Sequence, residues 1–148
     1  MAETFVLSKI LLVREKEKDE AQKAYFHSRE FFEEIATRLY TLLRKKEDAE
    51  ESYENYIQTT TPLDRIKEQI AYIEKLNKQI LSLQSDVQEA RNEMERKQTK
   101  LTNAYVEVKK YEKVIEKRKN AHASYIRKKE NESMDEISLQ RYLNKKIR

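Results

Sequence analysis

The stretch IQTTTPLDR, residues 57–65, contains the only proline of this 148-residue chain, which has no glycine. Tight turns usually need glycine, which tolerates positive φ, or proline, which presets φ. Thr61, Pro62 and Asp64 match a helix start, with an N-cap hydroxyl, a proline at the first helical position and a carboxylate near the positive helix end. The residue before a proline disfavours α conformation. The sequence therefore predicts one turn, at residues 58–61.

The composition is that of a highly charged chain rather than an ordinary globular domain. Charged residues make up 39% and hydrophobic residues 38%, and there is no cysteine. Such a composition is typical of long helices and coiled coils, but it also occurs in disordered chains. No stretch approaches the ~18 apolar residues of a membrane-spanning helix, and the N-terminal residues lack signal-peptide features. We therefore expect a cytoplasmic protein with no disulfide and no direct membrane insertion.

A seven-residue apolar repeat favours a coiled coil over disorder. Steps of four and three from Leu7 to Tyr56 meet an apolar or aromatic residue at eleven of fifteen positions. Steps of seven from Ile66 to Ile115 meet an apolar residue every time. Spacing sustained over this length indicates a left-handed coiled coil. The main predicted seam residues are Ile35, Leu39, Leu42, Ile73, Ile80, Val87, Met94, Leu101, Val108 and Ile115.

These patterns predict an all-α fold, an antiparallel two-helix coiled-coil hairpin that forms a single domain over residues 1–148. Helix 1 is expected at about residues 5–57 and a longer helix 2 at about residues 62–130. Two seams joined by a short loop can bury each other within one chain. The alternative is one long kinked helix that dimerises. In the hairpin, residues beyond about Lys117 have no partner within the chain.

The end of helix 2 is basic. Residues 118–148, here called the basic segment, contain nine Lys and Arg against four Asp and Glu, a net charge of +5, whereas the other 117 residues net about −1. The apolar seam is lost there, because Arg118, His122 and Lys129 fall at seam positions. The stretch NESMDEIS, residues 131–138, has capping-box spacing and could interrupt the helix, although the helix could also continue through it. A free basic arm is a surface suited to an outside partner.

The residues of known catalytic and metal sites are missing. The two histidines, His27 and His122, are far apart in sequence and do not match a zinc motif. Without glycine the chain has no phosphate-cradling loop. A two-helix rod also offers no enclosed pocket that would shift the pKa of a carboxylate. We predict no catalytic residue, no metal and no cofactor, and expect an adaptor or regulator rather than an enzyme.

Three other classes of protein share some of these features. The basic stretch at residues 116–130 contains a tyrosine, as nucleic-acid-binding segments do, but glutamates dilute it, and DNA-reading basic regions usually adjoin a parallel zipper. Prefoldin-like chaperones also form long helical hairpins, but they carry β-hairpins, for which no strand and turn signals are present. The main alternative is a structural coiled-coil spacer or oligomerisation protein. We expect no nucleic-acid partner.

Two stretches carry a resemblance to a known family. They are FVLSKILLVREKEKDEA at residues 5–21 and EKRKNAHASYIRKKENESMDEIS at residues 116–138, the second with a Met134-Asp135-Glu136 step. Together with the chain length and the longer second helix, they resemble the FliJ family of flagellar type III export proteins, whose injectisome relatives are YscO-type stalk proteins. The resemblance covers the whole chain.

The resemblance implies a fold and a role. Family members are antiparallel two-helix coiled coils similar to the central stalk of rotary ATPases, without catalytic activity of their own. They dock into the hexameric export ATPase, promote its assembly, and contact the membrane export-gate protein and export chaperones. The expected location is the cytoplasmic face of the cell membrane, through the export apparatus. The residues that match the ATPase-facing region are Arg118, Lys119, Arg127, Lys128 and Lys129.

A second surface is expected in the middle of the hairpin, where apolar residues lie off the seam. Ala36, Tyr40 and Leu43 share one stripe of helix 1 at i, i+4, i+7 spacing, and Leu81 is at about the same height on helix 2. Clusters of exposed apolar residues often mark binding sites. We predict that these residues contact the export gate. The alternative is that Tyr40 and Leu43 only widen the seam.

Overall fold

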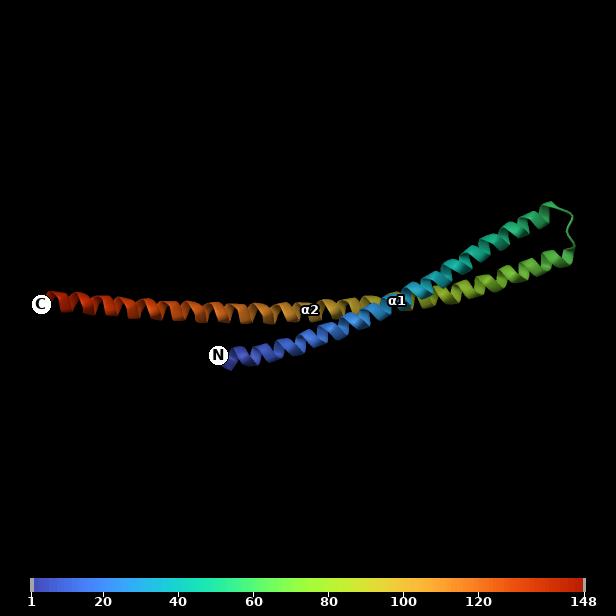
Figure 1. Cartoon of the computed structure of the whole chain (residues 1–148). Coiled ribbons are helices and arrows are strands. Elements are labelled where there is room, and N and C mark those ends of the chain that lie inside the picture. Colours follow the sequence, from blue (N-terminus) through green and yellow to red (C-terminus); the bar gives the residue numbers. More distant parts are fainter. Residues whose placement is uncertain (1, 148) are drawn as a thin grey trace. The chain divides into compact units, whose positions relative to one another are not determined.

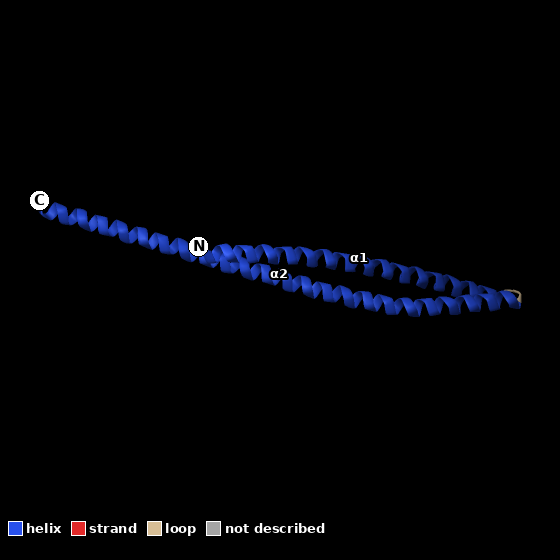
Figure 2. Ribbon diagram, turned by 90° about the horizontal axis from the view of Figure 1, so that it is seen from below, coloured by secondary structure: helices blue, strands red, loops and turns tan. Residues whose placement is uncertain are grey.

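The computed structural model describes residues 2–147 of the chain, and the side chains of residues 2–146. It contains two helices, α1 (Ala2–Gln58) and α2 (Leu63–Ile147), joined by a short connection (Figure 1). Within the described residues there is no strand, and only the connection is drawn as loop (Figure 2). The all-α prediction with a longer second helix is confirmed: α1 has 57 residues and α2 has 85.

α1 ends without a residue in the left-handed backbone conformation. The Thr59 N–H donates to the Asn55 carbonyl at 3.2 Å, and the Thr59 hydroxyl donates to the same carbonyl at 2.9 Å. These two bonds satisfy a carbonyl that would otherwise have no partner at the helix end. No residue in the described part of the chain has positive φ. The turn is therefore built from threonines and one proline, as the absence of glycine requires.

The start of α2 differs in detail from the prediction. The Pro62 carbonyl accepts the N–H groups of Arg65 at 3.1 Å and Ile66 at 3.5 Å, which makes Pro62 the N-cap by hydrogen bonding. The Thr61 hydroxyl lies 3.1 Å from the Thr59 hydroxyl and does not cap the helix. The prediction that Thr61 is the N-cap is therefore wrong. The Thr61 hydroxyl instead donates to that of Thr59, whose own hydrogen is donated to the Asn55 carbonyl.

The chain divides into two compact units. Unit 1 comprises Met1–Lys18 and Asn103–Arg148, and unit 2 comprises Asp19–Thr102. Unit 2 contains the turn and is an antiparallel helical hairpin. Unit 1 pairs the first part of α1 with the last part of α2, and here too the pairing is antiparallel.

The seam of unit 2 is narrow. Six side chains of this seam are buried, each with no more than 7% of its surface exposed. Three of the six are alanines, which allow the two backbones to approach closely. The other predicted seam residues, such as Leu42 and Val87, are half-buried, as expected of a seam with only one partner helix. The buried set is Ala21, Ile35, Ala49, Leu76, Ile80 and Ala90.

Two side chains fix the register of unit 2. The Gln69 side-chain amide donates to the Ala49 carbonyl at 2.9 Å, and the Arg91 guanidinium lies 5.6 Å from the centroid of the Phe32 ring. In each contact the two residues are separated from the turn by nearly the same number of residues, one on α1 and the other on α2. The seams predicted from the sequence therefore meet in the expected order.

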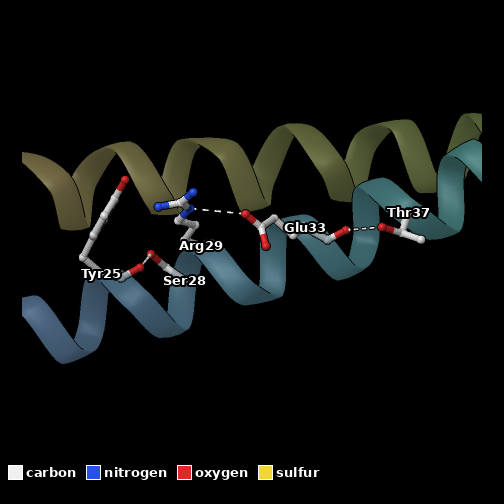
Figure 3. Close-up of polar contacts among 5 residues, drawn as sticks. All are labelled: Tyr25, Ser28, Arg29, Glu33 and Thr37. Carbon is white, nitrogen blue, oxygen red and sulfur yellow. Dashed lines mark hydrogen bonds and ion pairs between the residues drawn. The ribbon is translucent and has the colours of Figure 1, made fainter.

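Local polar pairs support α1 (Figure 3). Arg29 Nε donates to the Glu33 carboxylate at 3.2 Å, and the Thr37 hydroxyl donates to the Glu33 carbonyl at 2.8 Å. The Ser28 hydroxyl donates to the Tyr25 carbonyl at 2.7 Å. Exposed i, i+4 pairs contribute only ~0.2–0.5 kcal/mol each, so the seam supplies most of the stability.

Unit 1 has a more polar seam. Val108 and Ile115 are buried, but Arg14 occupies a seam position on α1, with its guanidinium 5.8 Å from the Tyr111 ring centroid. Hydrogen bonds to Glu17, at 3.0 Å, and to Tyr111 raise the pKa of Arg14. The Arg14 Nε is buried without a hydrogen-bond partner in the described part of the chain. This end of the hairpin is consequently held less by apolar burial than unit 2 is.

Beyond the start of α1, α2 continues without a partner helix. An ion pair joins Glu3 to Arg118, and every residue from 116 to 146 is exposed. α2 runs to Ile147, so the expected end near residue 130 is wrong, and of the two alternatives for residues 131–138 the continuous helix is the one observed. The capping-box spacing is not used, because the preceding residues are already helical and their N–H groups are bonded within the helix.

Candidate partner-binding sites

The basic segment presents its cations on all sides of a single helix. Lys119, Arg127, Lys128 and Lys129 are all exposed. Three of them are consecutive, so they point in directions about 100° apart at 3.6 residues per turn. Arg118 is exposed too, but it is ion-paired with Glu3. The arrangement suits a partner that surrounds the helix better than one that touches a single face.

Local contacts support this unpartnered helix. Two i, i+4 cation–π pairs lie along it: Lys129 is 5.1 Å from the Tyr125 ring centroid, and Lys146 is 5.4 Å from that of Tyr142. Lys145 and Lys146 also lie in its last turn, where cations are favoured by the helix dipole. The segment can therefore remain helical while its surface stays free for a partner.

A hollow of about 390 Å³ lies where the start of α1 meets α2. Glu3 and Arg118, which are 115 positions apart, meet at this hollow. Sequence reasoning missed the site because no local pattern connects residues so distant in the chain. At this hollow the cationic side chains of Arg118 and Lys119 lie beside the first turn of α1. Its lining residues are Glu3, Thr4, Arg118, Lys119, Ala121 and His122.

The predicted mid-hairpin stripe is mostly exposed. Tyr40 is 58% exposed, Leu43 39% and Leu81 67%, whereas Ala36 is half-buried. The register of unit 2 places Leu81 level with Tyr40. The Tyr40 hydroxyl accepts a hydrogen bond from Arg44 at 3.0 Å, within the same helix. Tyr40 and Leu81 are thus two exposed apolar side chains at the same level of unit 2, and the less exposed Leu43 lies nearer the seam. These three residues are here called the apolar patch.

A groove lies on the opposite flank of the same stretch. On α1, Arg38 and Thr41 turn to one side of the seam, while Tyr40 and Leu43 turn to the other, given 100° per residue. The groove has a volume of about 510 Å³. Sequence reasoning missed it because a groove between helices exists only once the helices pack. Its lining residues are Thr37, Arg38, Thr41, Leu42, Gln79, Ser82, Leu83 and Asp86.

In residues 2–147 no three side chains of His, Cys, Asp or Glu gather as a metal site would need. Neither helix has, over its described residues, a run apolar enough to cross a membrane.

Comparison with known proteins identifies the family. A match to the family described as flagellar FliJ protein covers residues 4–146. The chain belongs to the FliJ family. It is 32% identical over 143 residues to the flagellar FliJ protein of Bacillus subtilis (strain 168), a match that covers 97% of both chains. No solved structure matches. The resemblance to the FliJ family seen in the sequence is thus confirmed.

Proposed function

We propose that this protein is a component of the flagellar type III export apparatus and acts as the stalk and regulator of its hexameric export ATPase. Its basic segment contacts the ATPase, and the apolar patch contacts the membrane export gate. Export chaperones are further partners. The protein works at the cytoplasmic face of the membrane through these contacts and catalyses no reaction itself.

One observation carries the proposal. Residues 116–146 form a continuous helix that is exposed over its whole length, although the rest of α2 has a partner helix. Its cations point in several directions around the axis. One asymmetric helix cannot make the same specific contact with every subunit of a ring of identical subunits. Many weak contacts, none of them specific to one subunit, can still hold it inside the ring. Exposed charge pairs supply such contacts, at ~0–1 kcal/mol each.

The test is the effect of the purified protein on ATP hydrolysis by its cognate export ATPase. We expect stimulation at an ionic strength of about 0.01 M and much weaker stimulation at about 0.15 M, because the Debye length falls from about 30 Å to about 8 Å. A structural spacer, the alternative, does not alter hydrolysis at either ionic strength. Equal stimulation at both would contradict a contact made by dispersed surface charges.

The apolar patch gives a separate prediction. Leu81→Asp and Tyr40→Asp are each expected to weaken binding to the export gate by about ten-fold, or about 1.4 kcal/mol, because a carboxylate replaces an apolar contact. Titration calorimetry with the purified gate domain measures this. Phe26→Asp is the matched control, since Phe26 is 56% exposed and lies outside the patch. Unchanged affinity in both patch variants, or unfolding of both, would refute the gate assignment.

A further inference from the structure

The chain contains two blocks of opposite charge and equal length. Residues 47–58, the acidic block, hold five carboxylates and no basic residue. Residues 118–129, the basic block, hold five Lys or Arg and no carboxylate. All ten charged side chains are exposed. The acidic block belongs to unit 2 and the basic block to unit 1.

The acidic block is little neutralised by its own helix. The last turn of α1 has no basic residue. Glu50 is 3.8 Å from Lys46, but within the described residues no ion pair involves Glu47, Glu51 or Glu54. Like charges at i, i+4 spacing, such as those of Glu47 and Glu51, destabilise a helix, and local rules broken in this way often mark functional surfaces.

Three of the five carboxylates of the block share one face. Glu47, Glu51 and Glu54 follow i, i+4, i+7 spacing. They point away from the seam, into which Ala49 is buried. Ile57, next along this side, is 57% exposed and adds an apolar contact.

The basic block has matching properties. It belongs to the α2 stretch that has no partner helix, and its Tyr125 and Ile126 are 55% and 42% exposed beside three consecutive cations. Two basic blocks would repel each other, whereas a basic and an acidic block attract. The charge of the unpartnered helix therefore selects the acidic block, rather than another basic block, as its counterpart in a second copy.

We propose that the basic block of one molecule binds the acidic block of a second copy of this chain. The contact combines opposite charges with the exposed apolar side chains inside each block. This inference goes beyond the proposed function and does not depend on it. If the basic block also binds the ATPase, self-association and ATPase binding compete for the same cations.

Sedimentation velocity of the full chain tests the proposal without any ATPase. At an ionic strength of about 0.01 M we expect species larger than the monomer that grow with concentration. At about 0.15 M we expect the association to weaken at least ten-fold, because screening shortens the reach of the charges. A monomer at every concentration at the lower ionic strength would overturn the proposal.

Charge reversal identifies the blocks. The basic-block variant Arg127→Glu, Lys128→Glu, Lys129→Glu and the acidic-block variant Glu47→Lys, Glu51→Lys, Glu54→Lys should each be monomeric alone. An equimolar mixture should associate again, because the unaltered acidic block of the first variant can pair with the unaltered basic block of the second, and the two altered blocks are complementary as well. Lysine and glutamate have similar helix propensities, so the acidic-block variant should remain helical by circular dichroism.

The matched control is Arg141→Glu, Lys145→Glu, Lys146→Glu, which makes the same charge change outside the basic block. It should associate as the unaltered chain does. If this control weakens association as much as the basic-block variant, or if the mixture stays monomeric, net charge rather than the pairing of blocks is responsible and the inference fails.

Discussion

Replacement of Leu76 by alanine is expected to lower the free energy of unfolding by about 2–4 kcal/mol. Leu76 is 3% exposed and belongs to the small buried set of unit 2. Its truncation leaves a cavity in a seam that only two helices line, and neither helix has another element to replace the lost contacts. Small domains are typically stable by about 5–15 kcal/mol, so the loss is a large fraction of the total.

Thermal and urea unfolding followed by circular dichroism measure this effect. Leu81→Ala is the matched control, because it is the same substitution on the same helix at a side chain that is 67% exposed. We expect it to change stability by less than about 0.5 kcal/mol. Adding Ile80→Ala to Leu76→Ala should unfold much of unit 2 at physiological temperature. Equal effects of Leu76→Ala and Leu81→Ala would show that the seam does not stabilise the hairpin.

Removal of residues 118–148 is expected to abolish stimulation of the export ATPase while the hairpin stays folded. The truncated chain keeps the buried Val108 and Ile115 and loses the exposed Glu3–Arg118 ion pair. Such a pair contributes about 0–1 kcal/mol. The melting temperature should therefore change little, whereas the proposed contact with the ATPase is lost completely.

Hydrolysis assays and circular dichroism of the same preparations test both halves of this prediction. The variant Arg127→Glu, Lys128→Glu, Lys129→Glu should also lose stimulation, without shortening the helix. The Leu81→Asp variant serves as the control, because it alters the apolar patch and leaves the cations intact. Full stimulation by the truncated hairpin would show that the ATPase contact lies elsewhere on the chain.

The sequence by itself determined the fold class and the seam. A seven-residue repeat sustained over this length specifies coiled-coil helices, and every position in the two predicted rows is buried or half-buried. One proline in a chain without glycine also determined the place of the turn. The net charge of the basic segment could also be predicted from the sequence, because it depends only on the residue types and not on how the helices pack.

The tertiary structure alone decided the details that depend on which residues meet. Thr61 had the chemistry of an N-cap, but its hydroxyl met that of Thr59. The spacing at residues 131–138 matched a helix start, yet α2 continued, because a local pattern does not reveal whether the preceding turn is already helical. The groove beside Leu42 and the Glu3–Arg118 pair arose from packing residues distant in sequence. Periodicity specifies which face of a helix is buried, but only the packed pair of helices specifies what lies opposite each residue.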